Sequence, residues 1–381
     1  MKALVIGLGV SGRGAAKLLL QQGYEVIGVD RTVSAAAGVT VVSEEAAVGS
    51  VDVTVVSPGV PRDHPLVVGR EVIGEAELAM RHLRNVAIGI TGTNGKTTLT
   101  LLMTHLLRVA GKKARALGNV GESLAEYACA PDEEEILVVE LSSYQLETMT
   151  TRGFDLGLIT NIFPDHLDRY PNFEAYKQTK YRLDSLLKKG RVIDADSYLQ
   201  LTEKKRYWEI KDDPLLRAAL ALSMKMGISW KQFKEGVATF KRPPHRIEHV
   251  RRLRGVDFIN DSKGTNAASV LFAVAQVKGP ILLIAGGRGK GETYDVWKKP
   301  FEGKVRKVFA IGEIAPQLKR ELDNVEIFAN LEDAVKKAYS QAKEQETILL
   351  SPGAASFDQF QNYQERGDVF KEIVKNLKDC P

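Results

Sequence analysis

The sequence predicts an α/β fold divided into three domains. Apolar runs of strand length alternate with stretches of helical periodicity along the whole chain, a pattern typical of parallel sheets covered by helices. Glycine-rich turns follow several of these runs. A chain of 381 residues also exceeds what one hydrophobic core usually supports. We therefore expect successive domains at residues 1–85, 86–241 and 242–381.

Charge, cysteine content and hydropathy narrow the classes of protein that fit. The formal net charge is +5, and no dense basic run is interleaved with aromatic residues, so we expect no nucleic-acid partner. The densest basic cluster, Arg251-Arg252-Leu253-Arg254, is expected to form a solvated turn. Cys129 and Cys380 provide neither a disulfide framework nor a cysteine-based metal site. No apolar run is long enough to cross a bilayer, so we expect a cytoplasmic protein without a membrane partner.

A glycine-rich turn in the first domain predicts a Rossmann-like nucleotide-binding unit. Gly7-x-Gly9-x-x-Gly12 follows the first strand, the second strand ends at Asp30, and a later strand leads into Ser57-Pro58-Gly59. Taken alone this motif is weak evidence for NAD, because a tight turn needs the same glycines only for packing. The predicted elements are strands at 3–6, 25–29 and 52–56 and a helix at 13–22.

The second domain opens with the pattern of a phosphate-binding loop at residues 88–98, Ile-Gly-Ile-Thr-Gly-Thr-Asn-Gly-Lys-Thr-Thr. An apolar strand enters a glycine-rich turn, which leads through Lys96 and Thr97 into a helix at 99–110. Backbone N–H groups and the helix N-terminus would face the phosphates, Lys96 would meet their charge, and Thr97 would hold Mg²⁺. The strict motif has glycine where Ile90 stands, and an ordinary strand–helix turn is the alternative.

Polar residues follow the next two strands of this domain, predicted at 136–139 and 156–160. Ligands gather at the carboxyl ends of parallel strands, so Glu140, Asn161 and the pair Asp165-His166 are candidates. We interpret Glu140 as a Mg²⁺ ligand, although it also fits the start of a helix. His166 is either a ligand or a structural histidine.

Two further residues carry a weaker signal. Lys180 lies on the first of two helices predicted at 173–188 and 214–226, and its pattern alone is that of a surface lysine. Arg246 follows a proline-containing break at 240–244, the expected boundary of the third domain. An arginine at such a joint reaches a phosphate when the domains close, or forms an interdomain ion pair.

Polar loops at strand ends predict a binding site in the third domain, at 260–266, 286–291 and 351–360. Asp261 with Lys263 suits a nucleotide or an anionic substrate, and the glycine-rich loop around Lys290 suits a carboxylate or phosphate. Thr265 or Asn266 would otherwise only cap the following helix. We expect the loops to converge on one edge of a mostly parallel sheet. The predicted strands are 256–260, 281–285, 305–311, 325–328 and 348–351, and the predicted helices are 265–277, 315–322, 331–343 and 364–377.

Together these motifs resemble the Mur ligases. The resemblance runs from Gly7 to Phe370, and the tail at 350–360 with Arg366-Gly367 is most similar to the members that add D-glutamate. It implies a Rossmann-like N-terminal domain for a UDP-substrate, a P-loop ATPase-like central domain for ATP, and a Rossmann-like C-terminal domain for D-glutamate. The other stretches that carry it are Thr91–Thr98, Glu140–Glu147, Asp165–Asp168, Pro244–Arg246 and Asn260–Lys263.

The resemblance also implies an activity. The chain would be an ATP-dependent amide ligase that joins D-glutamate to UDP-N-acetylmuramoyl-L-alanine through an acyl phosphate, with Mg²⁺ as cofactor. Such an enzyme serves cytoplasmic peptidoglycan precursor synthesis, and we expect a monomer.

Individual residues take roles from the same resemblance. Lys96, His166, Lys180 and Arg246 would act in catalysis, with Lys180 in the place of a carbamoylated lysine whose carbamate supports Mg²⁺. The metal ligands would be Thr97, Glu140, His166 and Lys180. ATP would contact Gly92, Thr93, Asn94, Gly95, Lys96, Thr97 and Thr98, with Arg246 at the γ-phosphate and Asp261 at the ribose or adenine. The UDP-substrate would contact Val10, Ser11, Asp30, Arg31, Thr32, Ser57, Gly59, Asn119 and His166, and D-glutamate would contact Lys263, Thr265, Lys290, Ser356 and Tyr363.

One stretch departs from the family. Relatives carry a His-Asn-x-x-Asn run before a helix of the central domain, where this chain has Lys211 to Arg217, and the segment from Lys188 to Trp208 is shorter than usual. The usual side-chain amides for adenine are therefore missing. Three other functions are open: a ligase for another amino acid or for folate glutamates, an inactive nucleotide-binding regulator, and an NAD-dependent oxidoreductase.

Overall fold

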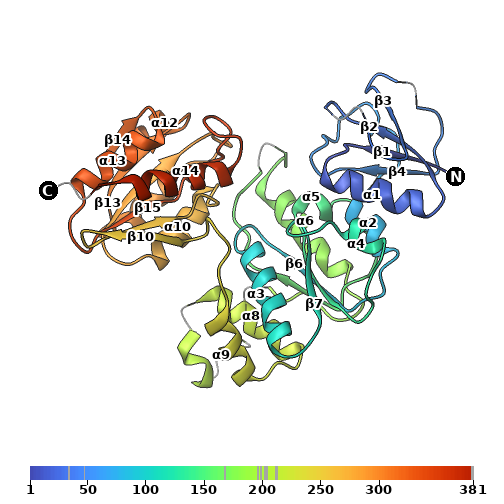
Figure 1. The fold of residues 1–381 in the computed structure, drawn as a ribbon, viewed down its shortest axis with the longest axis horizontal. Coiled ribbons are helices and arrows are strands. Elements are labelled where there is room, and N and C mark those ends of the chain that lie inside the picture. The colour runs from blue at the N-terminus through green and yellow to red at the C-terminus, as the bar shows by residue number, and fades with distance from the viewer. Residues whose placement is uncertain are drawn as a thin grey trace. The chain divides into compact units, whose positions relative to one another are not determined.

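The computed structural model describes residues 1–32, 35–46, 48–166, 169–194, 197, 200, 205–210 and 213–378. Within them the chain forms an α/β fold with three sheets, which follow one another along the chain (Figure 1). The chain divides into two compact units, one of Met1–Ile162 with Glu174–Phe240 and the other of Phe163–Phe173 with Lys241–Pro381. None of the described helices is both long enough and apolar enough to cross a membrane.

The first sheet contains five parallel strands in the order β3-β2-β1-β4-β5. Helix α1 begins at Val10, three residues earlier than predicted, and so includes Gly12. A Cβ at Gly12 would collide with the carbonyl oxygen of Gly7, so this glycine allows the helix to approach the strand end closely. The elements are β1 (Lys2–Ile6), α1 (Val10–Gln21), β2 (Glu25–Val29), β3 (Val39–Val42), β4 (Val53–Val56), β5 (Ile73–Gly74) and α2 (Glu75–Met80).

The second sheet contains four parallel strands in the order β7-β8-β6-β9. Its central strand β6 lies between β8 and β9, with Ile90 opposite Glu140 and Thr91 opposite Ile159. The elements are β6 (Ala87–Thr91), α3 (Lys96–Val109), β7 (Ala114–Gly118), α4 (Leu124–Ala128), β8 (Ile136–Glu140), α5 (Ser143–Leu146), β9 (Leu156–Ile159), α6 (Phe173–Ser185), the 3-10 helix η1 (Lys205–Ile210), α8 (Pro214–Lys225) and α9 (Trp230–Thr239).

Helices α1, α2 and α4 lie side by side and join the first two sheets (Figure 1). The Glu75 carboxylate accepts from the Ala125 N–H at 2.6 Å. The buried Glu77 carboxylate accepts from the N–H and hydroxyl groups of Thr150 and Thr151. A Cβ at Gly14 would collide with Ser123. Since one hydrophobic cluster also runs through both sheets, they form a single compact unit.

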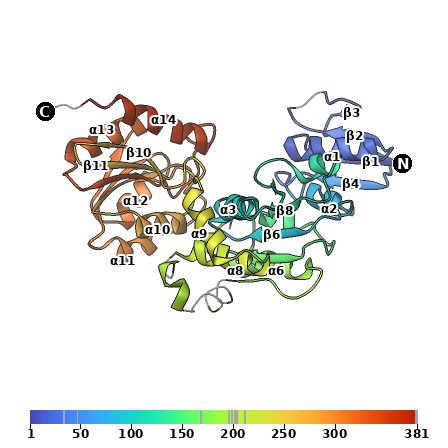
Figure 2. The ribbon, with the colours of Figure 1, turned by 60° about the horizontal axis from the view of Figure 1, so that its bottom comes forward.

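The third sheet contains six strands in the order β10-β11-β15-β12-β13-β14, all parallel except the β10–β11 pair. Figure 2 shows α13 and α14 on one face of this sheet and α10, α11 and α12 on the other. A separate apolar cluster forms on each face. The elements are β10 (Glu248–Leu253), β11 (Val256–Asn260), α10 (Ala267–Gln276), β12 (Ile281–Gly286), the 3-10 helix η2 (Asp295–Trp297), α11 (Lys298–Phe301), β13 (Val305–Ile311), α12 (Ala315–Glu321), β14 (Val325–Phe328), α13 (Leu331–Gln341), β15 (Thr347–Leu350) and α14 (Tyr363–Asn376).

The turn expected at Arg251 to Arg254 is partly wrong. Arg251 and Arg252 belong to β10, and only Arg254, at φ 52°, lies in a turn. The Arg251 guanidinium donates to the last carbonyl groups of α14, including that of Lys375 at 3.0 Å. These are carbonyl groups that a helix cannot satisfy internally, which explains a basic residue on this strand.

Candidate active site

The predicted phosphate loop connects β6 to α3. Gly92 and Gly95 have φ values of 136° and 83°, which a residue with a side chain rarely adopts. Helix α3 begins at Lys96, directly after the loop and without a side-chain cap, rather than at residue 99. The Lys96 ammonium donates to the carbonyl oxygens of Gly92 and Thr93, each at 2.9 Å. A cation over a glycine-rich loop at a helix N-terminus is an arrangement that binds phosphate.

The end of β9 holds this loop in place. The Asn161 side-chain oxygen accepts from the Asn94 N–H at 2.9 Å, and its carbonyl oxygen accepts from the Thr93 N–H at 2.8 Å. The Thr160 hydroxyl donates to the Asn94 carbonyl at 2.7 Å. A Cβ at Gly92 would collide with that hydroxyl. Asn161 was a predicted strand-end residue, whereas nothing in the sequence singled out Thr160.

Glu140 lies at the end of β8 and is only 2% exposed. One carboxylate oxygen accepts from the Asn119 side chain at 2.9 Å, and the other is buried without a hydrogen-bond partner. The alternative role at a helix start is wrong, because Ser142 caps α5 through a capping box with Gln145.

Magnesium fits this position. An orphaned carboxylate oxygen near a phosphate loop is a hard ligand of the kind that Mg²⁺ prefers. In the described part of the chain, no three His, Cys, Asp or Glu side chains gather as a metal site. Nucleotide-bound Mg²⁺ takes only one or two protein carboxylates, since phosphates and water supply the rest. A single carboxylate such as that of Glu140 is therefore compatible with such a site.

Lys180 is buried, so the surface position expected from its pattern is wrong. It is 2% exposed on α6, and its ammonium donates to the Thr91 hydroxyl at 3.3 Å. The ammonium also lies 5.2 Å from the ring centre of Tyr176, whose hydroxyl is 3.1 Å from that of Thr93. The inward positions of α6 are Tyr176, Lys180 and Leu183, and this spacing was the signal available in the sequence.

Asp165 and His166 belong to the second unit, because the segment Phe163–Phe173 packs there. The Asp165 carboxylate is 6% exposed and accepts from the Asn266 side chain at 3.1 Å. It also lies 3.4 Å from the Lys290 ammonium. His166 has a positive φ of 55°, and its ring nitrogen is 3.8 Å from Asp165. The structure therefore brings His166 and Lys290 into one cluster.

The three polar loops of the third sheet converge at its carboxyl edge, as the sequence predicts. The buried Arg366 guanidinium donates to the carbonyl groups of Ser262 at 2.8 Å, Ala354 at 3.2 Å and Gly286 at 3.4 Å, one from each loop. Burial lowers the pKa of Arg366 to about 10. Arg288 and Ala355 further pair as a two-residue antiparallel bridge. Lys290 and Ser356 thus lie on adjoining loops.

Two other predicted residues of this unit, Asp261 and Asn266, are buried. Burial raises the pKa of Asp261 to about 7, and its carboxylate accepts from the Ser351 hydroxyl at 2.8 Å and the Ile247 N–H at 3.3 Å. Asn266 caps α10, which was the alternative interpretation of this residue in the sequence. The Lys263 ammonium lies 5.1 Å from the ring centre of Tyr363.

The carboxyl edge of the third sheet has two more features. The charge of Arg246 opposes the rise in the pKa of Asp261. Ser356 is 2% exposed, yet the next residue, Phe357, is 62% exposed. An exposed aromatic ring beside the Lys290 loop is a feature that the sequence reasoning did not single out.

Residues predicted for the UDP-substrate gather at the strand ends of the first sheet. The Asp30 carboxylate accepts from the Leu8 N–H at 2.6 Å and from Thr32, and the Ser57 hydroxyl donates to the Gly7 carbonyl at 2.7 Å. Arg31 forms an exposed ion pair with Glu44. Val10 is 70% exposed at the start of α1, and Ser11 and Gly59 lie in the same strand-end region, whereas Asn119 follows β7 of the second sheet.

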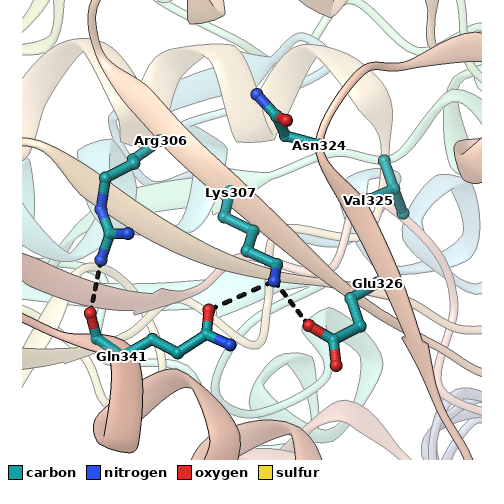
Figure 3. Close-up of a pocket in the computed structure, with 6 residues that line it drawn as sticks. All are labelled: Arg306, Lys307, Asn324, Val325, Glu326 and Gln341. Atoms are coloured by element: carbon teal, nitrogen blue, oxygen red, sulfur yellow. Dashed lines mark hydrogen bonds and ion pairs between the residues drawn. The ribbon is translucent and has the colours of Figure 1, made fainter.

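A groove of about 560 Å³ lies elsewhere, at the amino ends of β13 and β14. Its cations are already paired, since Lys307 contacts Glu326 and Gln341 and Arg306 donates to the Gln341 carbonyl (Figure 3). Ligands of open α/β sheets bind at the opposite, carboxyl ends. We therefore place the site at the loops. The residues that line the groove are Arg306, Lys307, Asn324, Val325, Glu326 and Gln341.

Family models and curated relatives match this chain. Residues 90–211 match the Mur ligase middle domain, and residues 245–353 match the Mur ligase glutamate ligase domain. A UDP-N-acetylmuramoylalanine–D-glutamate ligase from Protochlamydia amoebophila is 41% identical, over 99% of this chain and 98% of the relative. The chain belongs to the Mur ligase family. A ligase of the same name from Alkaliphilus metalliredigens is 33% identical over the same shares of both chains.

Solved structures of a MurF ligase and of a pseudomurein peptide ligase share the fold. The MurF ligase from Thermotoga maritima in complex with ADP has a TM-score of 0.62 at 16% identity, covering 98% of this chain and 95% of that one. A pseudomurein peptide ligase from Methanothermus fervidus has a TM-score of 0.59 at 17% identity, covering 99% and 100%. At such identities the likeness establishes the α/β fold with parallel sheets.

This Mur ligase lacks segments that its relatives have. The alignment with the Protochlamydia amoebophila ligase spans 435 positions, more than the 381 residues of this chain. In the stretch expected to replace the family's His-Asn-x-x-Asn run, Lys211 and Asp212 lie outside the described residues, whereas Asp213 caps α8 by accepting from the Leu215 and Leu216 N–H groups. The Leu215 side chain lies 3.4 Å from where a Cβ of Gly95 would be. Helix α8 therefore starts beside the phosphate loop.

We expect weak selection of the nucleotide base. Leu215 and Leu216 cannot hydrogen-bond a base edge, so affinity for ATP would come from its phosphates, Mg²⁺ and ribose, and a site without base hydrogen bonds discriminates weakly. GTP should support turnover within about tenfold of ATP, a gap near 1.4 kcal/mol. Phosphate release assayed side by side with both nucleotides checks this. A preference for ATP far above tenfold would show that another group reads adenine.

Proposed function

We infer that this chain is an ATP-dependent ligase that joins D-glutamate to UDP-N-acetylmuramoyl-L-alanine in peptidoglycan synthesis. The observation that carries this function is a phosphate loop with Lys96 folded over it, flanked by Glu140 and the buried Lys180, in a chain 41% identical to a ligase of that name. The substrate carboxylate attacks the γ-phosphoryl of ATP to give an acyl phosphate and ADP. The amine of D-glutamate then attacks the acyl carbon, and phosphate leaves.

The residues of the first unit would hold the phosphates for this transfer. Lys96 would exchange its loop carbonyl partners for phosphate oxygens. Thr97 and Glu140 would hold Mg²⁺, and a carbamate on Lys180 would support a second ion. When bound, Mg²⁺ offsets the phosphate charge. Phosphoryl transfer depends mainly on such positioning and charge stabilisation.

Three domains would divide the substrates among them. Residues 1–85 would form a Rossmann-like domain for the UDP-substrate, 86–241 a P-loop ATPase-like domain for ATP, and 242–381 a Rossmann-like domain for D-glutamate. The two carboxylates of D-glutamate need cationic and hydroxyl partners, which Lys263, Thr265, Lys290, Ser356 and Tyr363 would supply. A cytoplasmic monomer is part of this proposal.

An acceptor panel tests the function. ATP-dependent phosphate release with UDP-N-acetylmuramoyl-L-alanine should require D-glutamate and be much slower with L-glutamate or L-lysine. Turnover with L-lysine in place of D-glutamate would assign the chain to another ligase of the family. No phosphate release with any acceptor would point to a regulator that binds nucleotide without turnover.

Lys290→Ala should raise the KM for D-glutamate by about tenfold to a hundredfold, because a hydrogen bond to a charged group contributes about 1.5 to 3 kcal/mol. The KM for ATP should change little. Initial rates with each substrate varied in turn measure both constants, and Lys298→Ala, whose side chain is 54% exposed on α11, is the matched control. Equal rises in both KM values would place Lys290 outside the D-glutamate pocket.

A further inference from the structure

Glu292 connects two loops of the third sheet that are proposed to bind the amino acid. It lies two residues after Lys290, and one of its carboxylate oxygens accepts from the Ala267 N–H at 2.7 Å. Ala267 begins α10 and follows the turn that carries Thr265. The Glu292 carbonyl oxygen also accepts from the Gln317 side chain of α12 at 3.0 Å. Glu292 therefore fixes the position of Lys290 relative to Thr265.

The second carboxylate oxygen of Glu292 is buried and has no hydrogen-bond partner. A buried, ionised and unpaired oxygen is costly, whereas a protonated one is not charged and becomes a donor. Burial raises the pKa of Glu292 to about 7, the Asp165 charge adds to the rise, and the Ala267 N–H and the Lys290 charge oppose it. The acid is therefore placed to change its charge near neutral pH.

The charges around Glu292 decide whether its neutral or its ionised form favours binding of an acidic ligand. Lys290 is already paired with Asp165 at 3.4 Å. From the other side, Glu321 of α12 accepts from Gln317 and from the Tyr294 N–H, and Tyr294 follows in the same loop. Lys290 and Asp165 offset each other, so Glu321 already leaves this cluster with one net negative charge. An ionised Glu292 would add a second negative charge and with it a further repulsion of the two carboxylates of the acceptor. A neutral Glu292 removes that repulsion.

We propose that Glu292 is a positioning residue of the acceptor pocket, and that it carries a proton on its unpaired oxygen when a dicarboxylic amino acid binds. The proton comes from water and returns to water when the acid ionises, and no other bond changes. This inference rests on the proposed function, because it takes D-glutamate as the acceptor.

The test is the pH dependence of the KM for D-glutamate in the wild type and in Glu292→Gln, at saturating ATP, from pH 6 to 9. Above about pH 7, the wild-type KM should rise, approaching tenfold per pH unit for loss of one required proton. The glutamine is neutral at every pH, and its side-chain oxygen can still accept from Ala267. The ratio of the variant KM to the wild-type KM should therefore fall steadily as the pH rises above 7. The kcat values of the two enzymes should be similar.

Controls separate this role from a purely structural one. Glu313→Gln, with a side chain that is 58% exposed, should keep the wild-type pH profile. If Glu292→Gln does not fold, Glu292→Asn is the second neutral variant. Parallel KM profiles in the wild type and a folded neutral variant would overturn the proposal.

Failure of the proposed function would look different. A wild-type enzyme that releases no phosphate with D-glutamate at any pH removes that function, and the profile is then measured with the acceptor selected by the panel. The panel could select an acceptor without a second carboxylate. If the KM profiles of the wild type and Glu292→Gln still diverge with that acceptor, the assignment of Glu292 to dicarboxylate binding is overturned.

Discussion

Lys96→Ala should lower kcat by about a hundredfold to a thousandfold, the loss typical when one preorganised donor to developing negative charge is removed. The Lys96 ammonium is the group that lies over the phosphate loop, held by the Gly92 and Thr93 carbonyl oxygens. Binding of the UDP-substrate should be unchanged, because its predicted residues lie mainly at the first sheet. Phosphate release and equilibrium binding of the UDP-substrate measure the two effects.

A surface lysine provides the comparison for Lys96. Lys112 is exposed just after α3, and Lys112→Ala should keep wild-type kcat. Near-normal turnover of Lys96→Ala would show that residues 92–98 are only a strand–helix turn. Loss of UDP-substrate binding along with turnover would indicate that the variant has misfolded.

Lys180→Ala should lower kcat by about a hundredfold, a loss usual for groups that support a metal site. The side chain is 2% exposed and reaches Thr91 beside the phosphate loop, so its carbamate would lie close to the nucleotide. Short-chain carboxylates added to the variant should restore part of the activity, since they can take the place of the carbamate. Removing bicarbonate from the buffer should lower the activity of the wild type.

Lys177 lies one turn earlier on α6 and allows the same substitution on the exposed face, where its side chain is 41% exposed. Lys177→Ala should remain fully active and should not respond to added carboxylates. Full activity of Lys180→Ala would remove the carbamate hypothesis. Lost activity without any response to carboxylates or bicarbonate would leave Lys180 a role in packing against Thr91 and Tyr176.

The interior strands of the sheets could be predicted because each is an apolar run that ends at glycine or a polar residue. The edge strands β3, β5, β7 and β10 were missed because they are short or carry charges. Charged residues such as Arg115 in β7 and Arg251 in β10 are more typical of loops in a sequence. In the structure Arg115 pairs with Glu135, and Arg251 donates to carbonyl groups at the end of α14. Edge strands commonly carry such charges, which discourage pairing with another chain.

The sequence revealed the phosphate loop and Glu140 because local order alone defines a strand end. It did not reveal that Lys180 is buried or that Asp165 pairs with Lys290, since both depend on contacts between distant parts of the chain. The burial of Lys180 had one local signal, its place between Tyr176 and Leu183 on one stripe of α6. The contact of Asp165 had none, because residues 163–173 leave the second sheet to pack in the other unit.

The joint formed by α1, α2 and α4 determines how this chain can be cut into pieces. Two glycines in addition to Gly14 show how closely the joint is packed. A Cβ at Gly74 would collide with Thr148, and a Cβ at Gly153 would collide with Met80. A fragment that ended at residue 85 would expose these close-packed surfaces to water, so the first sheet is not an exchangeable module. A fragment that began at Lys241 would keep its own sheet, yet it would lose Asp165 and leave Lys290 without that counter-charge. Chimeras with relatives should therefore exchange the first two sheets together and carry residues 163–173 with the C-terminal partner.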